Sequence, residues 1–128
     1  MRKNYFYLNQ KGFTLIELVS VMIIMGVVAS VSIQKFDIVS NTANERALIT
    51  AIKELNVRES LVWSNMKISE DGYTTDEDLW SLMQTDLVGY QWGAGEPTRV
   101  GGGTLSFKTA SRSLSRQQST PSAAGKWQ

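Results

Sequence analysis

The sequence predicts an α+β protein in which a long N-terminal helix packs on a small antiparallel sheet. Residues 13–34 are almost entirely apolar, and residues 41–66 contain neither glycine nor proline. Long segments of this kind favour helix. Eight of the ten glycines and both prolines lie after residue 71, where they mark turns between short strands.

Length and composition limit what the chain can be. Its 128 residues suffice for one small domain on a long helix, but not for two independent cores. The formal net charge of +1 gives no basic excess for binding nucleic acid. The chain has no cysteine and no histidine, so it lacks disulfides and the commonest general base and metal ligand. We therefore expect no enzyme activity, no catalytic residue and no cofactor.

The first half of the predicted helix has the length of a membrane span. No charge occurs between Leu18 and Gln34, and Phe13 extends the apolar segment toward the ~20 residues that cross a bilayer. The residues before it carry only basic charges, which by the positive-inside rule keep the N-terminus in the cytoplasm. These basic residues are Arg2, Lys3 and Lys11. We expect a single-pass inner-membrane protein whose residues after about Lys35 lie outside the cytoplasm.

Glu17 is the one charged residue inside this apolar segment. An ionised group in a span costs roughly 2.5–3.5 kcal/mol on insertion scales, so a partner is expected. Two simpler interpretations are a secretory signal cut near residues 27–29 and a plain anchor with Glu17 at the headgroups.

A third interpretation is a resemblance to a family. The run Gly12-Phe13-Thr14-Leu15-Ile16-Glu17 after a short basic leader resembles the prepilin peptidase site of type IV pilins and type II secretion pseudopilins. The resemblance covers about residues 11–32. It implies that prepilin peptidase removes residues 1–12 by cutting between Gly12 and Phe13, and that Phe13 is then N-methylated.

The resemblance also assigns a partner to Glu17. In the family, the matching glutamate pairs with the free N-terminal amine of a neighbouring subunit, here that of Phe13. A free α-amino group has a reference pKa of about 8, so it is charged when Glu17 is ionised. Buried together among apolar helices, the two charges would favour one axial stagger between subunits.

We expect four segments: the leader 1–12, a membrane and filament-core helix 13–38, the amphipathic half of the same helix 39–68, and an exported head 69–128. Glu59 interrupts the apolar face of the third segment, so we expect it to reach solvent or to pair with a base such as Arg58. Glu54 and Arg58, four residues apart, support the helix from outside. The apolar face consists of Leu48, Ala51, Ile52, Leu55, Val62 and Met66.

Near the start of the head, Gly72 is the first residue that strongly signals the end of a helix. Thr75 and Asp78 fit a capping box, which predicts a short helix from Asp76 to about Asp86. Alternating residues predict strands near 88–92, 104–108 and 113–117, and 119–125 reads as coil. Most tryptophans should be in the core, with Trp127 the least certain because chain ends fray. The others are Trp63, Trp80 and Trp92.

The acidic residues around Thr75 allow a second interpretation. Calcium takes six to eight oxygens, and Asp71, Asp76 and Asp78 lie close in sequence, beside Glu70 and Glu77. The spacing does not match an EF-hand loop, and helix capping explains Thr75 to Asp78 more simply.

Together these features predict the structural subunit of a type IV pilin-like filament. Its partners would be prepilin peptidase/methyltransferase, other pilin-like subunits and the inner-membrane assembly machinery. The short head without cysteines favours a pseudopilin or minor pilin over a major pilin, because many pilins close a C-terminal loop with a disulfide. The alternative is a single-span protein that exports a binding domain and does not polymerise.

Overall fold

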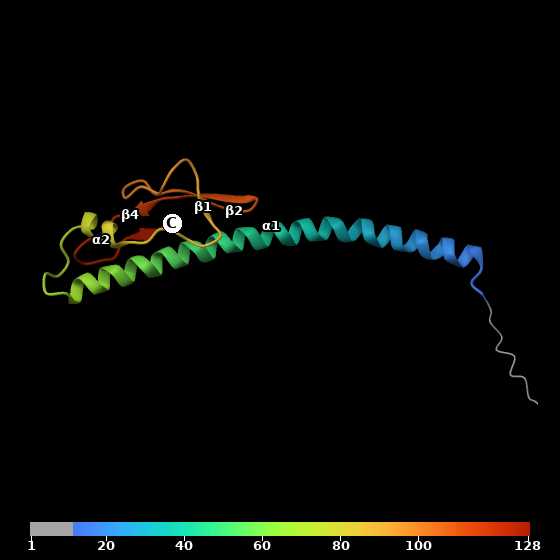
Figure 1. Ribbon diagram of the computed structural model, residues 1–128, viewed down its shortest axis with the longest axis horizontal. Coiled ribbons are helices and arrows are strands. Elements are labelled where there is room, and N and C mark those ends of the chain that lie inside the picture. The colour runs from blue at the N-terminus through green and yellow to red at the C-terminus, as the bar shows by residue number, and fades with distance from the viewer. Residues whose placement is uncertain (1–11) are drawn as a thin grey trace, which may run out of the picture. The chain divides into compact units, whose positions relative to one another are not determined.

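The computed structural model of the chain describes residues 12–128 and has the predicted α+β fold (Figure 1). Its two helices are α1 (Leu15–Ile68) and α2 (Asp76–Leu82). The five strands are β1 (Gln91–Trp92), β2 (Gly103–Phe107), β3 (Ala110–Leu114), β4 (Arg116–Gln117) and β5 (Lys126–Trp127).

Helix α1 runs without interruption for 54 residues, close to the predicted bounds. Its C-terminal end is followed by Gly72 in the left-handed region, at a φ of 67° that favours glycine. The chain divides into two compact units, and α1 crosses the boundary between Ile38 and Val39. We call residues up to Ile38 unit 1 and residues Val39–Gln128 unit 2.

Two small antiparallel sheets belong to unit 2. The first has the strand order β1-β2-β3, with Leu105 of β2 between Trp92 and Arg112. A two-residue turn joins β2 to β3, and Lys108 within it has a φ of 52°. The second sheet pairs β4 with β5, so that the C-terminus returns to the head. In Figure 1 both sheets lie along the unit 2 part of α1.

The core of unit 2 forms between α1 and these sheets. From the predicted apolar face, four residues are buried, whereas Ile52 and Val62 are half-buried. The core combines this face with β2, β3, β5 and the segment after α2, through Leu48, Ala51, Leu55, Met83, Leu105, Leu114 and Trp127.

The short helix α2 begins as predicted but ends at Leu82, not near Asp86. Carbonyl groups after it are bound by side chains of other elements. Arg58 donates to the carbonyls of Gln84 and Asp86, at 3.2 and 2.8 Å, and Trp92 donates to that of Thr85, at 3.1 Å. These tertiary hydrogen bonds hold the segment outside the helix.

The predicted strand 88–92 is reduced to its last two residues. Gly89 has a φ of 86°, and the amide of Tyr90 donates to the carbonyl of Leu87, so the chain turns here. The turn leaves Val88 fully exposed.

The predicted strand 113–117 is split between the two sheets. Residues up to Leu114 pair with β2, whereas Arg116 pairs with Trp127. Between them, Ser115 exchanges two backbone hydrogen bonds with Gln128, of 2.9 and 3.0 Å. The chain therefore stops pairing with β2 and starts pairing with β5 at this residue. The segment 119–125 is coil apart from a bridge between Thr120 and Ala123, as predicted, but the strand β5 after it was not predicted.

Candidate functional site

The expected processing site lies just outside α1. Gly12 and Phe13 precede the helix, both are exposed, and the Phe13 side chain is 92% exposed. The peptide bond between them is therefore accessible to another protein. Cleavage and methylation at this bond remain predictions. The basic residues Arg2, Lys3 and Lys11 lie outside the described residues.

Glu17 closes a capping box at the start of α1. The amide of Thr14 donates to Glu17 Oε2 at 2.7 Å, and the amide of Glu17 donates to Thr14 Oγ1 at 3.3 Å. The first turn of a helix leaves its amides without intrahelical partners, and this exchange satisfies two of them. The Thr14-x-x-Glu17 pattern is thus a second capping box, in addition to the one that the sequence predicts at Thr75.

Among the described residues, the Glu17 carboxylate meets only neutral donors. Within residues 12–128 it forms no ion pair. Its negative charge lies at the positive end of the α1 dipole, which favours it. Cleavage at Gly12–Phe13 would create an amine one residue before Thr14, next to the same helix terminus.

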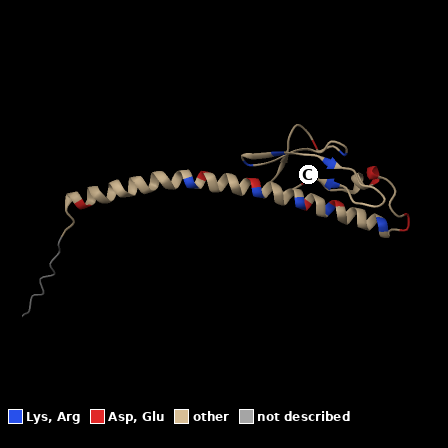
Figure 2. Ribbon diagram, turned by 180° about the vertical axis from the view of Figure 1, so that it is seen from behind, with Lys and Arg blue, Asp and Glu red and all other residues tan. Residues whose placement is uncertain are grey.

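The helix behind Glu17 is apolar on every side. In Figure 2 the first part of α1 shows one acidic residue and then no charge for several turns. Ser20 and Ser32 donate their hydroxyls to the carbonyls of Ile16 and Val28, at 2.7 and 2.8 Å. Their hydrogen bonds are thus satisfied within the helix, as a hydrocarbon environment requires. Among the described residues, α1 is the one helix long and apolar enough to cross a membrane.

A buried ionic cluster in unit 2 corrects the expectation for Glu59. This residue does not reach solvent, because its carboxylate is fully buried. It does pair with a base, but the base is Arg116 of β4 and not Arg58. Arg116 Nε donates to Glu59 Oε2 at 3.1 Å, and Trp127 Nε1 donates to the same oxygen at 2.7 Å. Arg58 instead pairs with Glu54 at 2.9 Å, as predicted.

Asp76 completes this cluster from the start of α2. Its carboxylate accepts from Arg116 at 2.8 and 3.0 Å and from the Ser119 amide and hydroxyl, both at 2.7 Å. Burial would raise the pKa of Asp76, but the hydrogen bonds from Arg116 and Ser119 outweigh it and hold this pKa well below its usual range. Burial likewise opposes the charge of Arg116, yet the two carboxylates raise its pKa.

The three calcium candidates do not come together. Asp76 faces Arg116, Asp71 is exposed, and Asp78 accepts from the hydroxyls of Thr74 and Thr75 at 2.6 and 2.7 Å. Those hydroxyls lower the pKa of Asp78. The predicted cap is confirmed, since the Asp78 amide donates to Thr75 Oγ1 at 3.2 Å. In the part of the chain that the structure describes, no group of three or more acidic residues is placed to hold a metal ion.

The tryptophans pack mainly in the core of unit 2. Trp127, the least certain of them from sequence, is only 1% exposed, and its ring lies 6.0 Å from that of Trp80 and 5.8 Å from that of Trp92. Trp63 is half-buried and donates its Nε1 to the carbonyl of Thr120 at 2.9 Å.

Comparison with known proteins bears on the N-terminal segment. Residues 7–33 match the family described as the prokaryotic N-terminal methylation motif. Neither a curated protein nor a solved structure matches the chain. The motif implies processing by prepilin peptidase and assembly with pilin-like subunits, and together with α1 it agrees with a single-pass inner-membrane precursor. The chain therefore carries the N-terminal segment of a type IV pilin-like prepilin with a class III leader.

Proposed function

We propose that this chain is a structural subunit of a pilin-like filament. It is inserted as a single-pass inner-membrane precursor with unit 2 outside the cytoplasm. Prepilin peptidase cleaves it between Gly12 and Phe13, and Phe13 is methylated. The mature subunit polymerises by burying residues from Phe13 to about Val39 among its neighbours.

One observation carries the proposal. Directly behind an accessible Gly12–Phe13 bond, α1 exposes large apolar side chains on all sides, from Leu15 to Val39. A helix that is apolar all round is stable only when something covers every face. A bilayer can do this before assembly, and a bundle of equivalent helices can do it in a filament.

Glu17 sets the axial stagger between neighbouring helices in this bundle. In the isolated chain its carboxylate is bound by the amide of Thr14, which is a neutral donor. In a filament the charged amine of a neighbouring Phe13 would bind it instead. A charge buried among apolar helices without that amine is strongly penalised, so one stagger between subunits is preferred.

The head supports the finer assignment to a pseudopilin or minor pilin. Unit 2 is short, and its C-terminal segment is fixed to α1 by ionic and hydrogen bonds without any cysteine. The assembled subunit would belong to a periplasmic pseudopilus or to a cell-surface pilus.

Mass spectrometry of the N-terminus tests the proposal. In cells with a prepilin peptidase, the recovered chain should begin at a methylated Phe13. A Gly12→Ala variant should be processed more slowly, since a larger residue before the bond obstructs the peptidase. Retention of residues 1–12 would instead indicate a simple anchor, and cleavage near residues 27–29 a secretory signal.

A further inference from the structure

We propose that the outer edge of β3 binds an extended, acidic segment of another protein as an added strand. The added strand would pair with the backbone of Ser111 and Ser113 and place a carboxylate beside Arg112. The site lies wholly within unit 2, so this inference does not depend on the filament function proposed above.

Strand β3 lies at the end of its sheet, with β2 on one side. In an antiparallel pair, successive residues point their N–H and C=O groups alternately toward the partner strand and away from it. The carbonyl of Thr104 accepts from the amide of Gly93, which follows β1, so Thr104 points away from β3. Its partner Ser113 therefore points away from β2, and so does Ser111.

The outward backbone groups of Ser111 and Ser113 are accessible. Both serines, and Arg112 between them, are exposed. Within residues 12–128, no hydrogen bond uses the outward N–H or C=O group of either serine. A strand edge with unpaired N–H and C=O groups is a template on which another chain can add a strand.

The same edge already pairs with a strand two residues further along the chain. Ser115 exchanges two backbone hydrogen bonds with Gln128, and β4 then pairs with β5. By the alternation along β3, Ser115 points to the same side as Ser113, away from β2. A strand added to β3 would therefore continue the line of β5 along this edge.

A depression of about 280 Å³ is formed by residues of this edge and of α1. Its lining is Glu45, Leu48 and Ile49 of α1 with Ser111 and Arg112 of β3. Ile49 is 42% exposed, although Leu48 beside it is buried. Alternate side chains of an added strand would point toward α1, and an aliphatic one would cover Ile49 in this depression.

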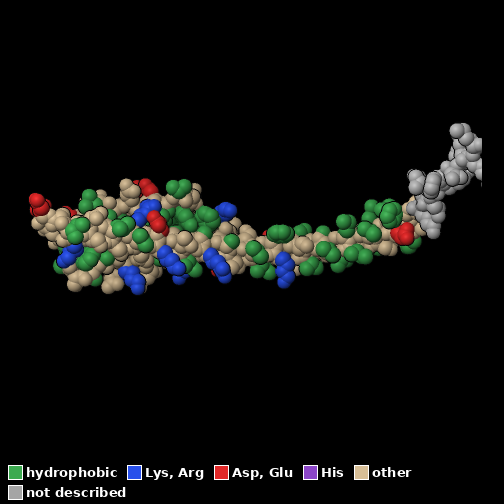
Figure 3. Space-filling model, turned by 90° about the horizontal axis from the view of Figure 1, so that it is seen from below, with side chains coloured by type: hydrophobic (Ala, Val, Ile, Leu, Met, Phe, Trp, Pro, Cys, Tyr) green, Lys and Arg blue, Asp and Glu red, His purple; other side chains and the backbone are tan. Residues whose placement is uncertain are grey.

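The charges at this edge favour an acidic occupant. Arg112 lies opposite the buried Leu105 of β2, so its side chain is on the α1 side of the sheet. It has no ion pair with any residue from 12 to 128. Lys108 adds a positive charge in the turn before β3, and basic side chains recur along α1 in unit 2 (Figure 3). Because Glu45 is the one acid of the depression, the added carboxylate should lie opposite Arg112.

A second copy of β3 is a poorer occupant than a different, acidic segment. An antiparallel pair of copies that joins Ser111 of each to Ser113 of the other places the two Arg112 side chains opposite one another. Like charges in that position are destabilising, and a charged edge residue is a common device against pairing of identical edges.

Two matched peptides test the site on the full, isotope-labelled chain in detergent micelles. In both, valine alternates with threonine, and the central valine is replaced by glutamate in one and by lysine in the other. The glutamate peptide should shift the amide resonances of Ser111 and Ser113 and slow their hydrogen exchange at least about tenfold. The amide of Arg112 points toward β2 and should change little. This alternation is specific to an added strand.

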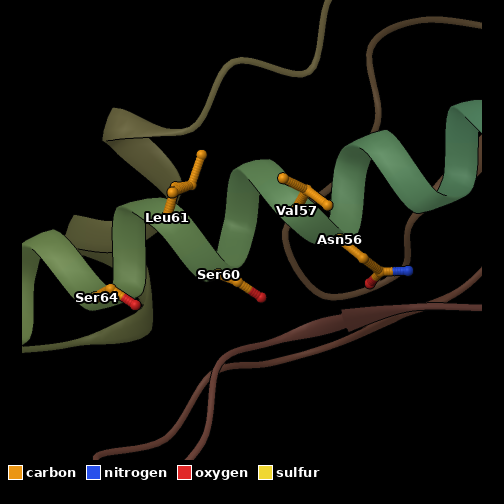
Figure 4. Close-up of a pocket in the computed structure, with 5 residues that line it drawn as sticks. All are labelled: Asn56, Val57, Ser60, Leu61 and Ser64. Atoms are coloured by element: carbon orange, nitrogen blue, oxygen red, sulfur yellow. The ribbon is translucent and has the colours of Figure 1, made fainter.

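Two variants and one internal control sharpen the test. Ser113→Pro removes an outward N–H that β2 does not use, and proline is tolerated at such positions, so it should fold and lose binding. Arg112→Glu leaves the backbone unchanged and should make the lysine peptide the tighter ligand. Ser60 and Ser64 line a separate depression on α1 (Figure 4), and their amides should not respond.

The outcomes separate the possible occupants. Alternating protection by the glutamate peptide, with the peptide preference reversed in Arg112→Glu, supports the proposal even where Ser113→Pro does not fold. No binding, equal binding of both peptides, an unreversed preference, undiminished binding to folded Ser113→Pro, or responses centred on Ser60 and Ser64 would overturn it. Protection of the Ser111 and Ser113 amides that rises with protein concentration alone would also overturn it, because a second copy would then occupy the edge.

Discussion

Arg116 of β4 and Glu59 of α1 form an ion pair in which neither side chain is exposed to solvent. The same guanidinium binds Asp76 at the start of α2 and the carbonyl of Arg99. One side chain therefore joins the C-terminal strands, both helices and the loop before β2. In a chain without cysteines, this cluster links the C-terminal strands to both helices without a covalent bond.

Removal of Arg116 should destabilise the head severely. An Arg116→Ala variant leaves the buried Glu59 carboxylate without its countercharge and leaves Asp76 with Arg99 alone, and breaking a buried pair costs about 3–5 kcal/mol. Urea unfolding of the full chain in detergent, followed by tryptophan fluorescence, measures this loss.

Arg112→Ala is the matched control for that variant. Arg112 is an exposed arginine on β3 without an ion pair in the described part of the chain. Its loss should change stability by less than about 0.5 kcal/mol. Equal stability of the two variants would show that the buried pair is dispensable.

Stability should fall in acid through Asp76. The pKa of this carboxyl is lowered in the folded state, so near pH 4 the unfolded chain binds more protons at Asp76 than the folded chain. Its contribution is complete above about pH 5 and is lost as the pH falls toward the lower folded value. In Asp76→Asn, the slope of unfolding free energy against pH should decrease by up to about 1.4 kcal/mol per pH unit. An unchanged slope below pH 4 would contradict this role.

The cap of α2 should contribute measurably to stability. Thr75→Ala removes the hydroxyl that accepts from the Asp78 amide, which should cost about 1 kcal/mol. Thr75→Ser keeps the hydroxyl and should restore most of the loss in the same urea experiment. If serine were no better than alanine, the hydroxyl would not be the source of the effect.

Gly125 should tolerate no side chain. A Cβ there would collide with the Glu59 carboxylate and approach the Gln117 carbonyl to 2.8 Å. Gly125→Ala should therefore cost about 1–3 kcal/mol by overpacking. Gly93→Ala, whose Cβ would meet Thr104 at an ordinary 3.5 Å, is the control, and equal loss in both variants would argue against a specific clash.

The helices and the N-terminal motif could be predicted largely from local sequence. Helix α1 follows from a long segment without glycine or proline, and the cap at Thr75 from a four-residue pattern. The Gly12–Phe13 junction and Glu17 were located because the motif is short and contiguous. The Thr14–Glu17 capping box likewise lies within four residues.

The rest depends on contacts between distant residues. Glu59 was visible as a charge on an apolar face, but its partner Arg116 lies 57 residues away and nothing near Glu59 indicates it. The strand β5 has two residues and no alternating pattern, so only its pairing with β4 defines it. The early end of α2 likewise depends on Arg58, which lies 26 residues before Gln84, the first residue whose carbonyl it binds.

The central claim is that Glu17 directs assembly, and its most direct test is incorporation in competition. We would express Glu17→Ala beside the natural chain and measure the share of each in sheared filaments by mass spectrometry. Glu45→Ala, which removes an exposed carboxylate from unit 2, is the control. We predict that the Glu17→Ala chain is inserted, cleaved and methylated but strongly depleted from filaments, whereas Glu45→Ala is not. Equal incorporation of processed Glu17→Ala chains would contradict the account.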